Sequence, residues 1–239
     1  MDESVERLKE LVSRCDNIVF FGGAGVSTES GIPDFRSVDG LYSQKYDYPP
    51  ETILSHDFFI KNTSQFYRFY REKMLFPDAE PNDAHRALSE LEKKGKVRAV
   101  ITQNIDSLHQ KSGSRNVLEL HGSVHRNYCM KCSRFYDLEY IMNSRDIPRC
   151  ECGGIIKPDV VLYQEGLDND TIEKAIRYIS QAEKLIIGGT SLGVYPAAGL
   201  VDYFRGKDLV LINKGATSRS CRASLVIDRK IGEVFRNLL

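Results

Sequence analysis

The feature that most constrains the fold is a glycine-rich loop that follows an apolar, strand-like run near the N-terminus. After Ile18–Phe21, Gly23 and Gly25 occupy the first two glycine positions of a G-x-G-x-x-G fingerprint. Such glycines let backbone N–H groups approach a pyrophosphate beside a helix N-terminus. Thr28 replaces the third glycine, and no clear acidic residue ends a second strand about 20 residues later, which disfavours a hydride-transferring dehydrogenase. The loop predicts a nucleotide site of another kind, with a simple tight turn as the alternative.

Strand-like and helix-like segments alternate along the chain, as they do around a parallel sheet covered on both faces. The expected strands are Ile18–Phe21, Val97–Thr102, Val117–Leu120, Leu185–Ile187, Leu209–Ile212 and Leu225–Ile227. The expected helices are Ser4–Arg14, Asn82–Lys94, Asp170–Gln181, Ala197–Arg205 and Ile231–Leu239. The pattern predicts an α/β fold with a doubly wound parallel sheet, whose ligand lies at the carboxyl ends of the strands.

Four short motifs around this scaffold resemble those of one enzyme family. Gly-Ala-Gly-x-Ser runs into Gly-Ile-Pro-Asp-Phe-Arg at 31–36, and Thr-Gln-Asn-Ile-Asp at 102–106, Leu-His-Gly at 120–122 and Gly-Thr-Ser at 189–191 follow. In this order they are similar to the signatures of the sirtuins, the NAD-dependent protein lysine deacylases, and the resemblance covers nearly the whole chain. It implies a Rossmann-like lobe, a helical insertion that includes a flexible cofactor loop, and a zinc module.

Two segments interrupt the alternating pattern and are expected to form a smaller second lobe. One is rich in Tyr, Phe and Pro, and the other contains four cysteines. We expect the large NAD-binding lobe to comprise residues 1–36, 81–122 and 158–239. The helical and cofactor-loop insertion then covers 37–80, and the zinc-binding module covers 123–157.

Composition restricts the partners of the chain more than its chemistry. The 239 residues carry 33 Lys and Arg against 33 Asp and Glu, so no global field favours nucleic acid or an anionic membrane. The acidic N-terminus lacks the apolar region of a signal peptide, and the longest apolar runs are shorter than the roughly 20 residues of a spanning helix. We therefore expect a cytoplasmic protein that binds neither nucleic acid nor membrane.

Four of the six cysteines lie within 24 residues and form two short knuckles. They are Cys129, Cys132, Cys150 and Cys152. In a reducing cytosol, an all-thiolate set without histidine favours one structural Zn²⁺ over a disulfide, although a redox pair or plain buried thiols remain alternatives. The second knuckle is Cys-x-Cys, whereas the sirtuin pattern is usually Cys-x-x-Cys, and this shortening is expected to strain the site or weaken the metal. The isolated Cys15 and Cys221 are expected to be small core residues.

His121 is the candidate general base, because it ends an apolar strand-like run, precedes Gly122 and titrates near neutrality. By resemblance, the acyl oxygen of an acyl-lysine attacks C1′ of the nicotinamide ribose, nicotinamide leaves, and an alkylimidate linked to ADP-ribose forms. His121 then activates a ribose hydroxyl that attacks the imidate carbon, and water completes the release of lysine and O-acyl-ADP-ribose. The same resemblance implies that Asn104 holds the ribose or a water and that Asp106 accepts a hydrogen bond from the nicotinamide carboxamide. The alternatives are a structural histidine and, for Asp106, a helix cap.

The resemblance also assigns the residues around NAD. It implies that Phe35 covers the nicotinamide pocket and excludes water, and that Arg36 and Gln103 position cofactor oxygens. Phe35 is otherwise a core aromatic, and hydroxyls that follow strands, such as Thr190, are commonly turn residues. The full expected set is Gly23, Ala24, Gly25, Thr28, Asp34, Phe35, Arg36, Gln103, Asn104, Ile105, Asp106, His121, Gly189, Thr190, Ser191, Asn213 and Lys214.

Residues 158–165, Pro-Asp-Val-Val-Leu-Tyr-Gln-Glu, resemble the segment that pairs with substrate in sirtuins. An acetylated, lysine-containing protein is expected to bind as an extended strand between this segment and residues 193–195, through backbone hydrogen bonds. The expected contacts are Val160, Val161, Leu162, Tyr163, Gly193, Val194 and Tyr195. Leu162 and Gln164 depart from the family's aromatic-aromatic-Gly-Glu ending, which puts the shape of the acyl-lysine tunnel in question. An ordinary strand and loop is the alternative. No Tyr-x-x-Arg pair follows the Pro-Asp-Phe-Arg motif, so short neutral acyl groups are expected.

Together these features predict an NAD-dependent protein lysine deacetylase that transfers the acyl group to ADP-ribose and releases nicotinamide and O-acetyl-ADP-ribose. Two other functions stay open: a protein mono-ADP-ribosyltransferase that uses the same NAD site, and a non-catalytic NAD-sensing module. His121, Asn104 and Asp106 together argue against a sensor, but acyl transfer and ADP-ribosyl transfer share these residues.

Overall fold

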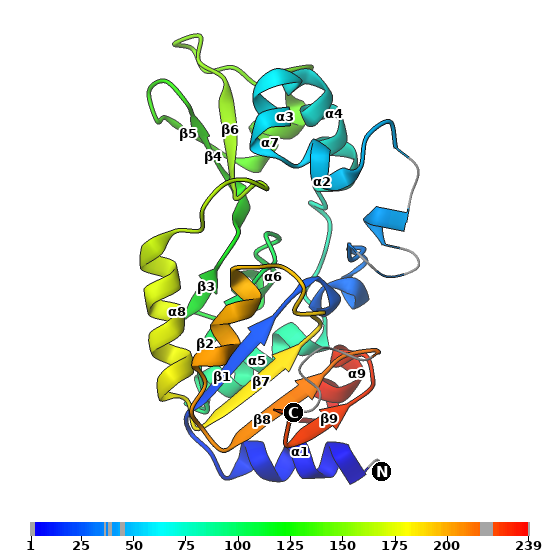
Figure 1. The fold of residues 1–239 in the computed structure, drawn as a ribbon, viewed down its shortest axis with the longest axis vertical. Coiled ribbons are helices and arrows are strands. Elements are labelled where there is room, and N and C mark those ends of the chain that lie inside the picture. The colour runs from blue at the N-terminus through cyan, green and yellow to red at the C-terminus, as the bar shows by residue number, and fades with distance from the viewer. Residues whose placement is uncertain (1–2, 36, 38–39, 44–45, 216–221, 239) are drawn as a thin grey trace.

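The structure, a computed structural model, describes residues 3–35, 37, 40–43, 46–215 and 222–238. Its two lobes lie one above the other along the long axis, with a parallel sheet and its helices in one and a small antiparallel sheet with short helices in the other (Figure 1). Both ends of the chain lie at the far end of the larger lobe (Figure 1).

The larger lobe is built on a six-stranded sheet in the order β3-β2-β1-β7-β8-β9, with every neighbouring pair parallel. The strands are β1 (Ile18–Gly22), β2 (Val97–Thr102), β3 (Val117–Glu119), β7 (Lys184–Gly188), β8 (Asp208–Ile212) and β9 (Leu225–Ile227). Counted along this sheet alone, the order is the 3-2-1-4-5-6 of dinucleotide-binding folds. Strand order therefore reverses between β1 and β7, the place where such sheets bind their ligands.

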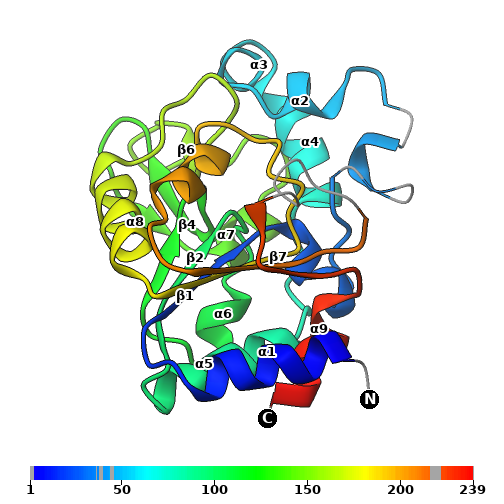
Figure 2. The same cartoon turned by 60° about the horizontal axis from the view of Figure 1, so that its bottom comes forward.

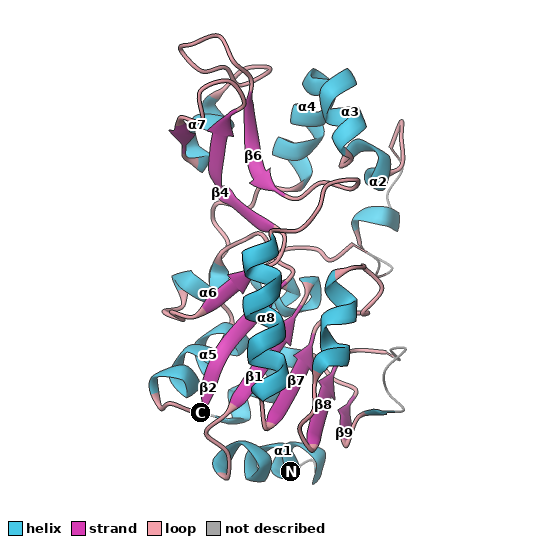
Figure 3. Cartoon of the chain, turned by 60° about the vertical axis from the view of Figure 1, so that its left-hand side comes forward, coloured by secondary structure: helices cyan, strands magenta, loops and turns pink. Residues whose placement is uncertain are grey.

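Helices cover both faces of this sheet, which confirms the predicted doubly wound fold. One face carries α1 (Glu3–Ser13), α5 (Asp83–Lys93) and α9 (Ile231–Phe235), which gather below the sheet in Figure 2. The other carries α8 (Asn169–Gln181) and the 3₁₀ helix η4 (Ala197–Tyr203), with α8 crossing in front of the strands in Figure 3. Successive residues of β1 serve the two faces, since Phe20 packs in one core cluster and Phe21 in the other.

The smaller lobe combines the two segments that interrupt the alternating pattern. Its sheet has the order β5-β4-β6, formed by β4 (Gly122–Cys129), β5 (Phe135–Tyr136) and β6 (Ile156–Val160). Four helices complete it, namely α2 (Pro50–Ile53), α3 (His56–Lys61), α4 (Thr63–Lys73) and α7 (Leu138–Asn143). The insertion and the cysteine-bearing segment share one core, in which the Tyr67 hydroxyl of α4 donates to the Ile156 carbonyl of β6.

Short elements connect these parts. They are the 3₁₀ helices η1 (Ala24–Val26), η2 (Thr28–Ser30), η3 (Leu41–Ser43) and η6 (Arg236–Leu238), and the α-helical turn α6 (Leu108–Lys111). The glycine-rich loop thus runs into two 3₁₀ turns rather than a long helix, because Gly31 adopts φ 83° and Pro33 disfavours helical geometry at the residue before it. The expected helix Ala197–Arg205 is likewise 3₁₀ and ends at Tyr203. Within the described residues, no helix is both long and apolar enough to cross a bilayer.

Candidate active site

The loops that follow β1 and β7 touch each other through their backbones at the switch point of the sheet. The Gly25 N–H donates to the Gly189 carbonyl at 2.8 Å, and the Gly23 N–H donates to the Gly188 carbonyl at 3.2 Å. A Cβ added to Gly25 would lie 2.8 Å from the Gly189 Cα, which is too close for any side chain. The predicted glycines are therefore brought together, and the close approach of the two backbones leaves no room for side chains at this contact.

The buried Ser27 and Asn104 and the half-buried Asp106 form one hydrogen-bonded group beside these loops. The Ser27 hydroxyl donates to Asp106 Oδ2 at 2.6 Å and accepts from Asn104 Nδ2 at 3.0 Å. Asp106 Oδ1 also accepts the Leu108 N–H at 2.9 Å, so the carboxylate caps α6 as well as facing the site. Burial raises the pKa of Asp106, while the bonds from Ser27 and Leu108 act in the opposite direction. Ser27 was not among the predicted site residues, although it stands in the Gly-x-Gly-x-Ser motif.

Gln103 carries a buried donor that no described residue satisfies. Its Oε1 accepts from the Thr190 hydroxyl at 3.3 Å, and the Thr190 oxygen in turn accepts the Leu192 N–H at 3.1 Å. Gln103 Nε2 is buried without a hydrogen-bond partner among the described residues. An unpaired buried amide costs free energy until it finds an acceptor. This donor at the carboxyl edge of the sheet fits a ligand rich in oxygens, such as NAD.

The orientation of the His121 ring is set by a backbone carbonyl that follows β2. Its Nδ1 lies 2.8 Å from the Gln103 carbonyl, which can only accept, so Nδ1 carries the proton and Nε2 keeps a free lone pair. Burial lowers the pKa of His121, and the hydrogen bond to the carbonyl opposes this effect. The imidazole is therefore neutral near pH 7, the form that a general base requires.

Among the other predicted NAD contacts, several side chains have local partners. Asp34 Oδ1 accepts the Ser37 N–H at 2.8 Å, and the Thr28 hydroxyl donates to the Gly25 carbonyl at 3.1 Å. Phe35 packs edge-on against Tyr42, with ring centroids 5.6 Å apart. Arg36 lies outside the described residues.

The remaining predicted contacts line the carboxyl edge of the sheet. Ala24 is partly buried in η1, and the Ile105 carbonyl accepts the Val124 N–H of β4 at 3.0 Å. Ser191 follows β7 and is exposed. Asn213 and the exposed Lys214 follow β8. These positions lie at the end of the sheet where the resemblance expects the nucleotide.

The predicted substrate segment runs alongside His121. Gly122 pairs with Val160, and the Val161 N–H donates to the His121 carbonyl at 3.0 Å. Tyr163 is anchored to the insertion, because its N–H donates to the Leu54 carbonyl at 2.9 Å. Its hydroxyl also lies 2.5 Å from the Tyr42 hydroxyl.

The second predicted group, Gly193, Val194 and Tyr195, lies in the loop between β7 and η4. Tyr195 is 67 % exposed there. Among the described residues, no hydrogen bond joins this loop to residues 160–163, so the pairing of the two groups stays a prediction.

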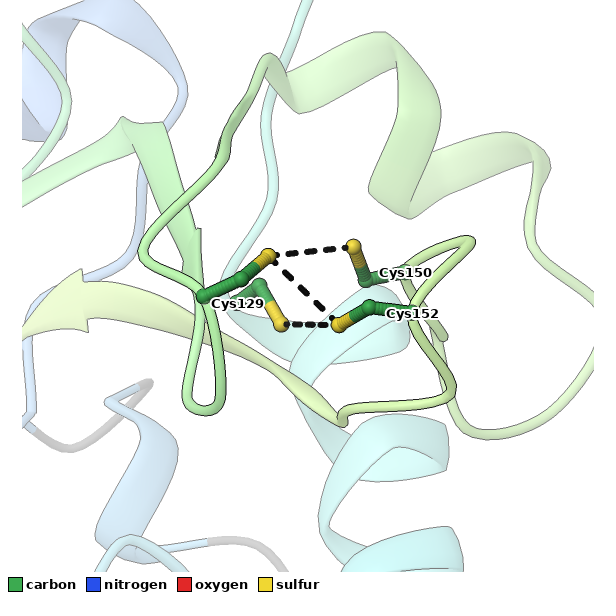
Figure 4. A group of neighbouring side chains, drawn as sticks. Cys129, Cys150 and Cys152 are labelled. Atoms are coloured by element: carbon green, nitrogen blue, oxygen red, sulfur yellow. Dashed lines mark hydrogen bonds between the residues drawn. The ribbon is translucent and has the colours of Figure 1, made fainter.

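The four clustered cysteines converge on one point between the β4–β5 turn and the loop before β6 (Figure 4). All four Sγ atoms lie within 4.8 Å of one another, and Cys129–Cys152 and Cys132–Cys150 are each 3.5 Å apart. Zinc–sulfur bonds of about 2.3 Å in a tetrahedron place sulfurs about 3.8 Å apart, so the set fits one Zn²⁺.

The shortened second knuckle does not prevent this convergence. Gly153 adopts φ 81°, and the Cys150 N–H donates to the Gly154 carbonyl at 2.9 Å, which turns both thiols to the same side. Cys15 is buried in the core, as expected, and burial raises the pKa of its thiol. Cys221 lies outside the described residues.

Comparison with known proteins agrees with this geometry. A model described as the Sir2 family matches residues 23–196. The chain is 57% identical over 241 residues to an NAD-dependent protein deacetylase of Clostridium acetobutylicum, covering 99% of this chain and 98% of the relative. A solved structure of the work "Structural Basis for the Mechanism and Regulation of Sir2 Enzymes" matches with a TM-score of 0.90 at 41% identity, over 100% of this chain and 97% of that one. A Sir2 complex with p53 peptide and NAD⁺ matches with a TM-score of 0.86 at 40% identity, over 100% and 97%. The chain belongs to the Sir2 family.

Proposed function

We propose that this chain is an NAD-dependent protein lysine deacetylase that transfers the acyl group of an acyl-lysine to ADP-ribose. The observation that carries the proposal is the state of His121, a neutral imidazole with Nε2 unprotonated, held beside the segment expected to bind the peptide. The similar proteins named NAD-dependent protein deacetylases support the same activity. The products are then nicotinamide, the free lysine and O-acetyl-ADP-ribose.

The chain's own residues supply positioning and one proton acceptor. NAD, when bound, supplies an activated C1′ and the ribose hydroxyl that finally carries the acyl group. His121 Nε2 takes the proton of a ribose hydroxyl, and the Gln103 carbonyl stabilises the imidazolium that results. The Nδ1–H of His121 donates to this carbonyl before and after the proton transfer, so the ring keeps its orientation while its charge changes.

The buried group around Asp106 holds the other end of the reacting cofactor. We assign to Asp106 the nicotinamide carboxamide and to Asn104 a ribose hydroxyl or a water. Ser27 fixes both side chains, since it bonds to each of them. Gln103 Nε2 is the donor offered to a cofactor oxygen. The remaining predicted NAD contacts belong to the same proposal, including Arg36.

The protein substrate is proposed to bind as an extended strand between residues 160–163 and 193–195. Backbone pairing of this kind gives affinity with little sequence selection, so the acyl-lysine itself supplies most of the specificity. Solved Sir2 structures that contain a p53 peptide or a propionylated peptide support a peptide substrate. We also propose that the protein acts in the cytoplasm, without nucleic acid or membrane, and that its lobes divide within a few residues of the boundaries expected from the sequence.

One Zn²⁺ is proposed to hold the cysteine-bearing part of the smaller lobe. A closed set of four thiolates leaves no open coordination position for substrate, so this metal has a structural role. Ligation would tie the β4–β5 turn to the loop before β6.

Mass spectrometry of the reaction tests the proposal. The protein is incubated with NAD and an acetyl-lysine peptide, and nicotinamide, free lysine peptide and O-acetyl-ADP-ribose are quantified. Equal amounts of all three, abolished in a folded His121→Ala variant, are expected. Nicotinamide without deacetylated peptide would instead assign ADP-ribosyl transfer or NAD hydrolysis, and absence of turnover with every acyl chain would leave NAD sensing.

A further inference from the structure

A polar network that contains none of the predicted site residues joins the large sheet to the small one. Ser107 donates to Glu119 Oε1 at 2.8 Å. Arg126 Nη1 donates to Glu119 Oε2 at 2.8 Å, and Arg126 Nε donates to Asp159 Oδ2 at 2.7 Å. A single guanidinium therefore joins two carboxylates on two different sheets, since Glu119 lies on β3 of the large sheet and Asp159 lies on β6 of the small one.

Each end of this network adjoins a part of the proposed active site. Ser107 follows Asp106 directly, and Asp159 precedes Val160, the first of the expected peptide contacts. The middle of the network, Glu119, lies two residues before His121. The network thus connects the residue after Asp106 with the residue before Val160.

The nicotinamide end depends on this network for its backbone geometry. Ser107 is held at φ 56°, a left-handed conformation that is strained for a non-glycine residue. Its hydroxyl bonds to Glu119 and lies 2.8 Å from the Ser123 hydroxyl, so surrounding contacts hold the strained turn in place. Loss of the anchor at Glu119 would release the turn that carries Asp106.

Charge makes the arginine the critical member. The Glu119 side chain is only 8 % exposed, and Arg126 is its cationic partner, itself 39 % exposed. A buried carboxylate without its cation is costly, and Glu119 also raises the pKa of the neighbouring Asp106. The titratable groups that act on the pKa of Asp106 are Glu119 from β3, which raises it, and His125 from β4, which lowers it. Lysine cannot replace the guanidinium of Arg126 at both carboxylates, because a single ammonium group lacks two donors in fixed directions.

We propose that Arg126 is a positioning residue that couples the nicotinamide loop, through Glu119 and Ser107, to the peptide-binding strand, through Asp159. The meaning of the two ends rests on the proposed function, but the mechanical coupling does not. Removal of the guanidinium should loosen both ends together. Replacement by lysine should keep the buried Glu119 paired and loosen only the peptide end.

Hydrogen exchange of the intact, zinc-loaded protein tests the coupling without catalysis. Arg126→Ala should speed exchange about tenfold in both segments 104–109 and 157–162, the effect of losing a coupling of the size usual for contacting groups. Arg126→Lys should affect 157–162 alone. The matched control is Arg134→Ala, which removes an exposed arginine paired with Glu151 in the same module. Faster exchange in only one segment of the Arg126→Ala protein would overturn the coupling.

Steady-state kinetics give a second, independent readout. Arg126→Ala should raise the peptide KM about tenfold and move the acidic limb of the NAD kcat/KM profile to higher pH, because Glu119 is left charged beside Asp106. A second substitution, Glu119→Gln, should return the pH limb but not the peptide KM. Asp159→Asn, which leaves Glu119 paired, should raise the peptide KM alone. An unchanged peptide KM in both Arg126→Ala and Asp159→Asn would refute the positioning role. An inactive wild-type protein would refute the proposed function, while the exchange result would still decide the coupling.

Discussion

Two buried histidines in the large lobe are expected to make the fold sensitive to acid. His85 of α5 and His109 of α6 are almost fully buried, with ring centroids 4.7 Å apart. His85 Nδ1 accepts the Asn82 N–H at 3.2 Å, whereas its Nε2 and both nitrogens of His109 are buried without a partner among the described residues. Burial, with a smaller effect of Arg86, lowers the pKa of His85 from 6.5 to about 4, and burial with His85 lowers that of His109 well below 6.5.

The sign of the effect follows from which state binds the proton. Both rings are neutral in the folded protein, while the unfolded chain takes up protons around pH 6.5. The contribution of these two neutral histidines to the free energy of unfolding is therefore fully present above about pH 6.5 and is lost as the pH falls toward 4. The lowering at His85 alone corresponds to roughly 3 kcal/mol, a large part of a typical free energy of unfolding of roughly 5–15 kcal/mol.

Urea denaturation between pH 4.5 and pH 7.5 measures this loss. In His85→Gln, which keeps an acceptor for the Asn82 N–H, the slope of the unfolding free energy should fall by up to about 1.4 kcal/mol per pH unit. His109→Phe should have the same effect. Release of zinc at acid pH affects the wild type and the variants alike, so it does not contribute to the difference between their slopes. Slopes that equal the wild-type slope in both buried-site variants would show the reasoning to be wrong.

Four further outcomes are expected. Cys150→Ser should lose the bound zinc, measured by elemental analysis, and a protein that keeps one equivalent contradicts the four-thiolate site. Gln164, at φ 77°, accepts the Asp57 N–H at the start of α3 through its side-chain oxygen. In urea denaturation, Gln164→Ala should be about 1 kcal/mol less stable than wild type, and Gln164→Gly should lie between the two because glycine relieves the backbone strain. Equal stability of the two variants would show that the backbone is unstrained. Gly122→Ala places Cβ 1.9 Å from a β6 carbonyl oxygen and should cost about 3 kcal/mol, whereas Gly166→Ala meets no atom within 4 Å and should cost little; equal thermal shifts would refute this. Because burial lowers the pKa of His121, peptide kcat/KM should rise with pH through an apparent pKa below 6.5, and a limb above 6.5 would argue against this base.

The centre of the large lobe was predictable because β1 and β7 are almost entirely buried. β1 and β7 read as continuous apolar runs, and the six expected strands agree with the structure to within one residue at each end. β4 was not predicted, since Gly122–Cys129 mixes polar and apolar residues without alternation and depends on pairing with the distant β6. Local sequence carries little information about a strand that only its partner stabilises.

The candidate site shows the same division between motif and context. Asn104, Asp106 and His121 stand in recognisable motifs, and the structure brings them to the same edge of the large sheet. The sequence did not predict a role for Ser27, because a serine that follows glycines is common in turns. Arg126 has no motif at all, and its partners lie on two different sheets. Such residues become visible only when the chain is folded.

The interlocked glycine loops have a consequence for how this protein is able to evolve. A Cβ at Gly189 would lie 2.4 Å from the Val26 nitrogen, and one at Gly25 would meet the Gly189 backbone. Both obstacles are main-chain atoms, which every amino acid possesses. A second substitution elsewhere changes only a side chain, so it cannot make room for a side chain at either glycine. Compensating pairs of substitutions are therefore excluded at this contact. Diversity among related chains must accumulate around this contact rather than through it.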